Sequence, residues 1–209
     1  MHLEPGHPDA ATPLLALAAR VLEDLGGEVV IHTGDDNLVR SRRDGDPGRA
    51  PFIVEAAGLP NLLHELVHVL QFGRLADDHG LDYSQIPFDL GDPAQRRHLW
   101  EELACCVVSC AYLAPAAEAP WFAEQVGIQG VFYGYDTDAP GFLAAVDATV
   151  LAHADELEAV ITRAYAEVER CLAAVGAGPL ARPRARLQFT TMWARFRADP
   201  VGCTRLVSR

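Results

Sequence analysis

Apolar residues recur every three or four positions in several stretches of this 209-residue chain. That spacing places them on one face of an α-helix, so it predicts amphipathic helices. The first stretch ends at Gly26-Gly27, which is a typical helix stop. Predicted helices occupy residues 13–25, 60–75, 94–112, 119–125, 141–175 with a bend near His153, and 187–197.

Short runs of β-branched and apolar residues predict strands between the first two helices. These strands cover residues 28–32, 37–40 and 51–55, with a turn-rich segment at 43–48 before the last one. A chain of this length can bury one sizeable core. We therefore expect an α+β fold that is mainly helical, with a small N-terminal β-sheet, as a single domain over residues 1–209.

The predicted helix over residues 60–75 carries an H-E-x-x-H motif, formed by His64, Glu65 and His68. Residues four apart lie on the same face of a helix, so both imidazoles can bind one metal ion. Glu65 lies between them, near enough to act on a water at the metal. Burying these three polar side chains among Leu and Val would be costly without a partner such as a metal. The motif predicts a metal site for hydrolysis.

A third metal ligand is expected on the next predicted helix, residues 94–112. The longer pattern H-E-x-x-H-x-x-G-x-x-H is absent, because Arg74 replaces its last His. Glu101 and Glu102 are adjacent acids on an otherwise apolar stretch. Neighbours on a helix point about 100° apart, so only one of the two can face the core. Their positions alone leave both as candidates.

With these motifs the chain resembles the gluzincin metallopeptidases, and more weakly the ImmA/IrrE-type and HtpX-type families among them. In those families a Glu that opens an E-x-x-A-[DN] pattern on a later helix is the third zinc ligand. The run Glu101-Glu102-Leu103-Ala104-Cys105 matches the E-x-x-A part. The resemblance implies Glu101 as the ligand and leaves Glu102 as the alternative. Cys105 stands where the families have an Asp or Asn that braces the first ligand His.

The resemblance covers only the two motif helices, and it implies a zincin-like metallohydrolase domain. The implied activity is that of a zinc-dependent metallopeptidase acting on a peptide or protein substrate. His64, His68 and Glu101 would bind Zn²⁺, and Glu65 would act as general base before it protonates the leaving amine.

Two other functions remain open from the sequence. Two His and one carboxylate also form the facial triad of non-haem Fe(II) oxygenases. With Fe²⁺ and 2-oxoglutarate the chain would then be a peptide hydroxylase. Alternatively, the metal would only tie two helices together in a non-catalytic binding protein, with a cysteine or a second Glu closing the site. The native metal distinguishes the peptidase from the hydroxylase.

Charge and composition exclude several classes of function. A net charge of −12 argues against a nucleic-acid partner. The chain contains no lysine, which excludes lysine-based Schiff-base chemistry. The C-terminal part is nevertheless locally basic, and we expect a solvated surface there, with docking of an acidic segment as the alternative. Its basic residues are Arg182, Arg184, Arg186, Arg195 and Arg197.

The five cysteines predict a reducing compartment, because their number is odd and none forms a zinc-finger C-x-x-C pair. Buried free thiols are the expected state. Neither a secretory signal pattern nor an apolar run of membrane-spanning length is present in the sequence. We therefore expect a cytoplasmic protein without a membrane partner, and the sequence does not indicate an oligomeric state. The cysteines are Cys105, Cys106, Cys110, Cys171 and Cys203.

Overall fold

The computed structural model describes most of the chain, and the described part forms two compact units. The described residues are 2–3, 13–32, 38–41, 52–72, 92–127, 139–176 and 178–199. The first unit comprises Met1–Leu81 and Ala164–Pro183, and the second comprises Asp82–Arg163 and Arg184–Arg209. The single zincin-like domain expected over residues 1–209 stays a prediction.

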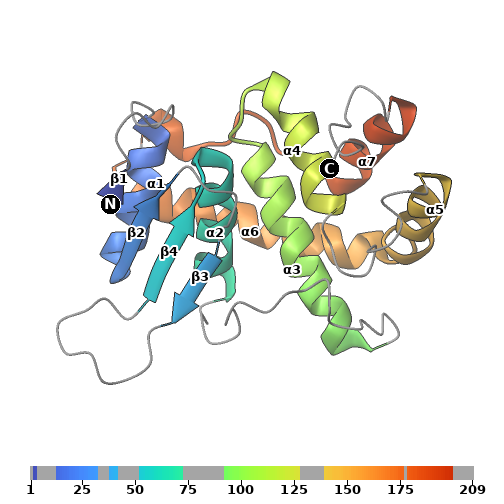
Figure 1. The fold of residues 1–209 in the computed structure, drawn as a ribbon, viewed down its shortest axis with the longest axis horizontal. Coiled ribbons are helices and arrows are strands. Elements are labelled where there is room, and N and C mark those ends of the chain that lie inside the picture. Colours follow the sequence, from blue (N-terminus) through green and yellow to red (C-terminus); the bar gives the residue numbers. More distant parts are fainter. Residues whose placement is uncertain are drawn as a thin grey trace. The chain divides into compact units, whose positions relative to one another are not determined.

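The first unit contains a four-stranded mixed sheet with the order β1-β2-β4-β3. Its strands are β1 (His2–Leu3), β2 (Gly27–Ile31), β3 (Leu38–Ser41) and β4 (Phe52–Ala56). β2 pairs in parallel with β1 and β4, and β3 pairs antiparallel with β4. Figure 1 shows β2, β4 and β3 side by side. The sheet therefore has β3 at one edge, although β3 precedes β4 in the chain.

Two helices of the first unit pack on this sheet. α1 (Pro13–Asp24) contacts β2, and α2 (Leu59–Phe72) contacts both β4 and α1. Every second side chain of β4 is buried, because successive side chains of a strand point to opposite faces of the sheet. α1 ends where Gly26 adopts a φ of 91°, a conformation that glycine accepts without strain. The predicted helix stop at Gly26-Gly27 is thereby confirmed.

In the second unit, the regular elements within the described residues are all helices. It contains α3 (Pro93–Cys110), α4 (Pro115–Gly127), α5 (Ala139–Thr149), the short 3₁₀ turn η4 (Leu151–His153), the first part of α6 (Ala154–Ala174) and α7 (Phe189–Ala198). The rest of α6 and the 3₁₀ turn η5 (Gly178–Ala181) belong to the first unit. α3 packs against α4 and α7, and α4 also contacts α7.

Aromatic side chains build much of the core of the second unit. The ring centroids of Phe122 and Phe189 lie 5.4 Å apart, and those of Trp193 and Phe196 lie 5.2 Å apart in a stacked pair. The indole N–H of Trp193 donates to Asp147 Oδ1 at 2.8 Å, which satisfies its polar atom inside the core. These contacts anchor α7 to α4 and α5.

The predicted mainly helical α+β fold with a small N-terminal sheet is confirmed by these elements. The predicted bend near His153 is also confirmed, because η4 separates α5 from α6. The prediction for residues 119–125 placed the start of α4 too late, since the helix begins at Pro115. Residues 73–75 of the predicted motif helix lie outside the described residues. None of the helices within the described residues has the length and the hydrophobicity of a membrane-spanning segment.

Candidate metal centre

α2 positions the H-E-x-x-H motif within a buried, apolar helix. Leu62, Leu66 and Val67 are at most 1 % exposed, and they hold α2 in the core of the first unit, where it contacts α1 and β4. Three residues of the motif share this environment, because His64 and Glu65 are buried and His68 is half-buried. The predicted helical setting of the motif is confirmed.

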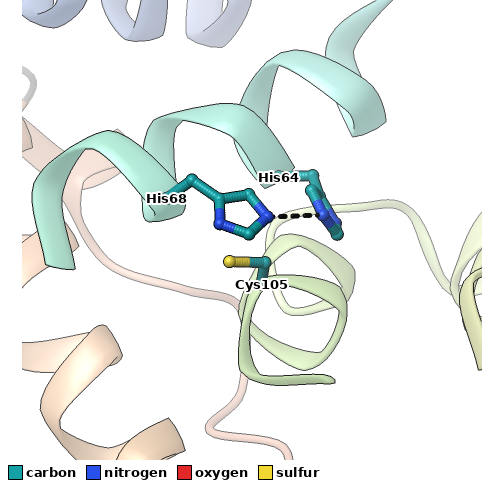
Figure 2. Close-up of side chains that lie close together, drawn as sticks. All are labelled: His64, His68 and Cys105. Carbon is teal, nitrogen blue, oxygen red and sulfur yellow. Dashed lines mark hydrogen bonds between the residues drawn. The ribbon is translucent and has the colours of Figure 1, made fainter. Parts of the chain in front are cut away.

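The two motif histidines face each other on successive turns of α2. Their Nε2 atoms lie 3.1 Å apart, and the ring centroids lie 4.9 Å apart with the planes tilted by 56° (Figure 2). A direct hydrogen bond requires one Nε2 to carry a proton and the other to offer its lone pair. Two nitrogen ligands at about 2.0–2.1 Å from a tetrahedral Zn²⁺ would lie about 3.3 Å apart. The observed separation is therefore close to that of a metal-binding pair.

Glu65 brings a carboxylate into the same part of α2. Glu65 is only 7 % exposed, although ionised side chains are rarely buried to this extent. Burial of a charge is costly unless other groups compensate for it. A buried ionisable side chain beside His64 is typical of functional sites.

The predicted third ligand, Glu101, lies on α3 in the second unit. Its Oε1 accepts a hydrogen bond from Arg97 Nε at 2.8 Å, and Oε2 lies 3.9 Å from His98 Nδ1. Its side chain is 16 % exposed. Glu101 thus already has a cationic partner one turn earlier on its own helix. The neighbouring Glu102 is half-buried, and the choice between the two as metal ligand stays a prediction.

Cys105 is a further donor on α3, one turn after Glu101. It is the third side chain labelled in Figure 2, and it is a fully buried free thiol. Cys105 offers a sulfur donor and the two histidines offer nitrogen donors, and zinc prefers donors of both kinds. The sequence placed Cys105 where the resembled families have a bracing Asp or Asn, and it left a cysteine open as a closing ligand without naming which one. The spacing of four between Cys105 and Glu101 was the available signal that both can share one helix face.

The other cysteines of α3 form a buried thiol group. Cys106 and Cys110 are both fully buried, and burial raises the pKa of the Cys106 thiol well above its ordinary value, with a hydrogen bond to Cys110 as a second cause. Such thiols are poor nucleophiles at neutral pH. The expected free-thiol state is confirmed for the four cysteines within the described residues, and Cys203 lies outside them.

Comparisons with known proteins identify no relative of this chain. No protein-family model, no curated protein and no solved structure matches it.

Proposed function

We propose that the chain is a zinc-dependent metallopeptidase in which His64 and His68 bind the metal. The observation that carries this proposal is the 3.1 Å separation of their Nε2 atoms on one face of a buried helix. Two imidazole nitrogens at this separation can bind one cation without a change of backbone. The buried carboxylate of Glu65 on the same helix supplies a proton acceptor, for which a purely structural metal site has no use.

When bound, Zn²⁺ would supply the Lewis acidity that polarises the scissile carbonyl group. Glu65 takes a proton from the attacking water and then delivers it to the leaving amine. His64 and His68 would hold the cation, and Glu65 on the same helix would orient the attacking water towards the carbonyl carbon. The packing of α2 against α1 and β4 keeps the three side chains in place.

In this proposal α3 supplies the third ligand. The resemblance to gluzincins favours Glu101 as this ligand. The burial of Cys105 and the softness of a thiolate ligand favour Cys105. The difference affects the metal as well. With a carboxylate as third ligand, the site would also match the facial triad of an Fe(II) hydroxylase, whereas a thiolate ligand would favour zinc.

Replacing the metal by Co²⁺ identifies the third ligand. If Cys105 binds the metal, the cobalt protein will show a near-ultraviolet sulfur-to-cobalt absorption that Cys105→Ser removes and Glu101→Gln retains. If Glu101 binds the metal, this absorption will be absent and Glu101→Gln will weaken metal binding by about 10- to 100-fold. Cys110→Ser is the matched control, because Cys110 is also fully buried on α3.

Glu65→Gln tests the proposed chemistry. The variant should retain the metal but lose about 100-fold or more of its peptide hydrolysis, because the amide cannot accept the proton. Glu124→Gln is the control, since Glu124 is an exposed residue of α4. The assay is hydrolysis of a fluorogenic peptide library by the metal-loaded protein. Undiminished turnover by Glu65→Gln would contradict the assigned role, and turnover that needs Fe²⁺ and 2-oxoglutarate would indicate the hydroxylase.

A further inference from the structure

The second unit contains a pocket of about 260 Å³ between α4, α7 and the segment before α7. Glu118 and Phe122 line it from α4, where they lie one turn apart. Met192, Arg195 and Phe196 line it from one face of α7. The pocket therefore results from the direct packing of two amphipathic helices.

The floor of this pocket is apolar. Phe122, Met192 and Phe196 are 2 %, 4 % and 5 % exposed, so their side chains are fixed by the core of the second unit. Phe122 contacts Phe189, and Phe196 stacks on Trp193. A ligand that enters the pocket would meet an ordered hydrocarbon surface, which favours an apolar group of similar size.

The rim of the pocket carries two arginines and one carboxylate. Arg184 donates through Nη2 to Glu118 Oε2, and Arg195 Nη1 donates to Glu118 Oε1 at 3.5 Å. Two guanidinium groups thus share one carboxylate, which leaves the rim with a net positive charge. Their side chains are 43 % and 67 % exposed, whereas that of Glu118 is 11 % exposed.

Arg184 is held in place by the backbone of the loop between α3 and α4. Its backbone N–H donates to Ala111 O at 2.9 Å, and its Nε donates to Leu113 O at 3.1 Å. A guanidinium group has five N–H donors, and the hydrogen bonds of Arg184 to Leu113 O and Glu118 use only part of them. The remaining donors of a fixed, planar group are suited to a second carboxylate.

We propose that this pocket binds a carboxylate that carries an apolar group, such as the C-terminal residue of a peptide or a small aromatic acid. The carboxylate would contact Arg184 and Arg195, and the apolar group would lie on Phe122, Met192 and Phe196. The volume is below the range of about 300–1,000 Å³ for drug-sized ligands, which fits one side chain with its carboxylate. Binding here does not depend on a metal at His64 and His68.

Calorimetric titration of the full chain tests this site with three probes. The probes are phenylacetate, an acetylated tripeptide that ends in phenylalanine with a free carboxylate, and the same tripeptide as its C-terminal amide. We expect the carboxylates to bind at concentrations up to about 5 mM and the amide not to bind. Tighter binding of the tripeptide acid than of phenylacetate would identify a chain end as the ligand, and the reverse order would identify a free acid.

Substitutions of the rim residues should change the affinity for the carboxylate in opposite directions. Arg195→Gln and Arg184→Gln should each weaken carboxylate binding by about tenfold or more, because each removes a charged hydrogen-bond donor. Glu118→Gln should tighten binding by up to about fivefold, because both guanidinium groups lose their competing carboxylate. Arg197→Gln is the control, since Arg197 lies on the same helix but pairs with Asp147.

A purely structural role of the three rim residues predicts none of these opposite effects. Circular dichroism and thermal unfolding of each variant show whether the fold is retained. Binding of the amide as tightly as the acid, no binding of either carboxylate, or unchanged binding by both arginine variants would overturn the proposal.

Discussion

Gly27→Ala should destabilise the first unit, because Gly27 lies directly opposite Phe52 in the parallel pair of β2 and β4. A Cβ atom on residue 27 would lie 2.2, 2.5 and 2.9 Å from Cε2, Cζ and Cδ2 of the Phe52 ring. Non-bonded carbon atoms normally lie about 3.5–4.0 Å apart, so the ring would have to withdraw by more than about 1 Å. Phe52 is only 4 % exposed, which leaves little room for that movement.

The expected cost follows from two opposing effects. Overpacking of a core costs about 1–3 kcal/mol. Alanine in a strand is favoured over glycine by about 0.5–1 kcal/mol, because less backbone entropy is lost on folding. The free energy of unfolding should therefore fall by about 1 kcal/mol, measured by urea unfolding followed by far-UV circular dichroism.

A double-mutant cycle with Phe52→Leu tests whether the ring is the cause. Leucine lacks the far ring atoms, so Phe52→Leu should cost clearly less in the Gly27→Ala background than in the wild type. A coupling energy above about 0.5 kcal/mol would support the steric reasoning. An equal or greater stability of Gly27→Ala, or strictly additive effects of the two substitutions, would refute it.

Two further predictions concern ionisable groups of the second unit. The pKa of Glu156 is lowered by the hydrogen bond from the indole N–H of Trp100 and by Arg96. Ionised Glu156 therefore stabilises the fold at pH values above its unfolded pKa of about 4.5. This stabilisation is lost as the pH falls through the lower pKa of the folded state. Glu156→Gln should therefore be less stable than the wild type at neutral pH, and urea unfolding should show this difference vanishing as the pH falls through the lowered folded pKa of Glu156; a constant difference would contradict the assignment. Cys106 should resist iodoacetamide in the native protein and react in urea, as peptide mass spectrometry would show, because its thiol is buried and its pKa is raised; rapid native labelling would contradict this burial.

Local patterns allowed the sequence to predict the helices well. The buried residues of α1 recur with helical spacing, and the glycine that ends it has a positive φ. The predicted helix started at residue 119 and missed the first turn of α4, which begins at Pro115. Proline is tolerated at the first helical position, where its missing N–H has no partner to lose.

Long-range pairing limited the prediction of the sheet. The strands β2, β3 and β4 were predicted close to their observed bounds, but nothing local indicates that β3 pairs on the outer side of β4. The short strand His2–Leu3 was not predicted, because two residues carry no periodic pattern. Sheet order depends on contacts between distant segments, which a single sequence does not display.

The same distinction applies to the candidate metal centre. The facing of His64 and His68 is a local consequence of helix geometry, so the sequence predicted it correctly. The ion pair between Arg97 and Glu101 is also local, since these residues lie four apart on α3. The identity of the third ligand depends on tertiary packing of α3, so Glu101 stays a prediction beside Cys105.

Metal content of the purified protein tests the central claim most directly. Elemental mass spectrometry on protein prepared without added metal should find about one zinc per chain, because the site has the nitrogen donors of a zinc centre. His68→Ala should lose this zinc, whereas His153→Ala, which changes a partly exposed histidine of the second unit, should retain it. Iron in place of zinc would contradict the peptidase assignment, and no metal in the wild type would contradict a metal site at His64 and His68.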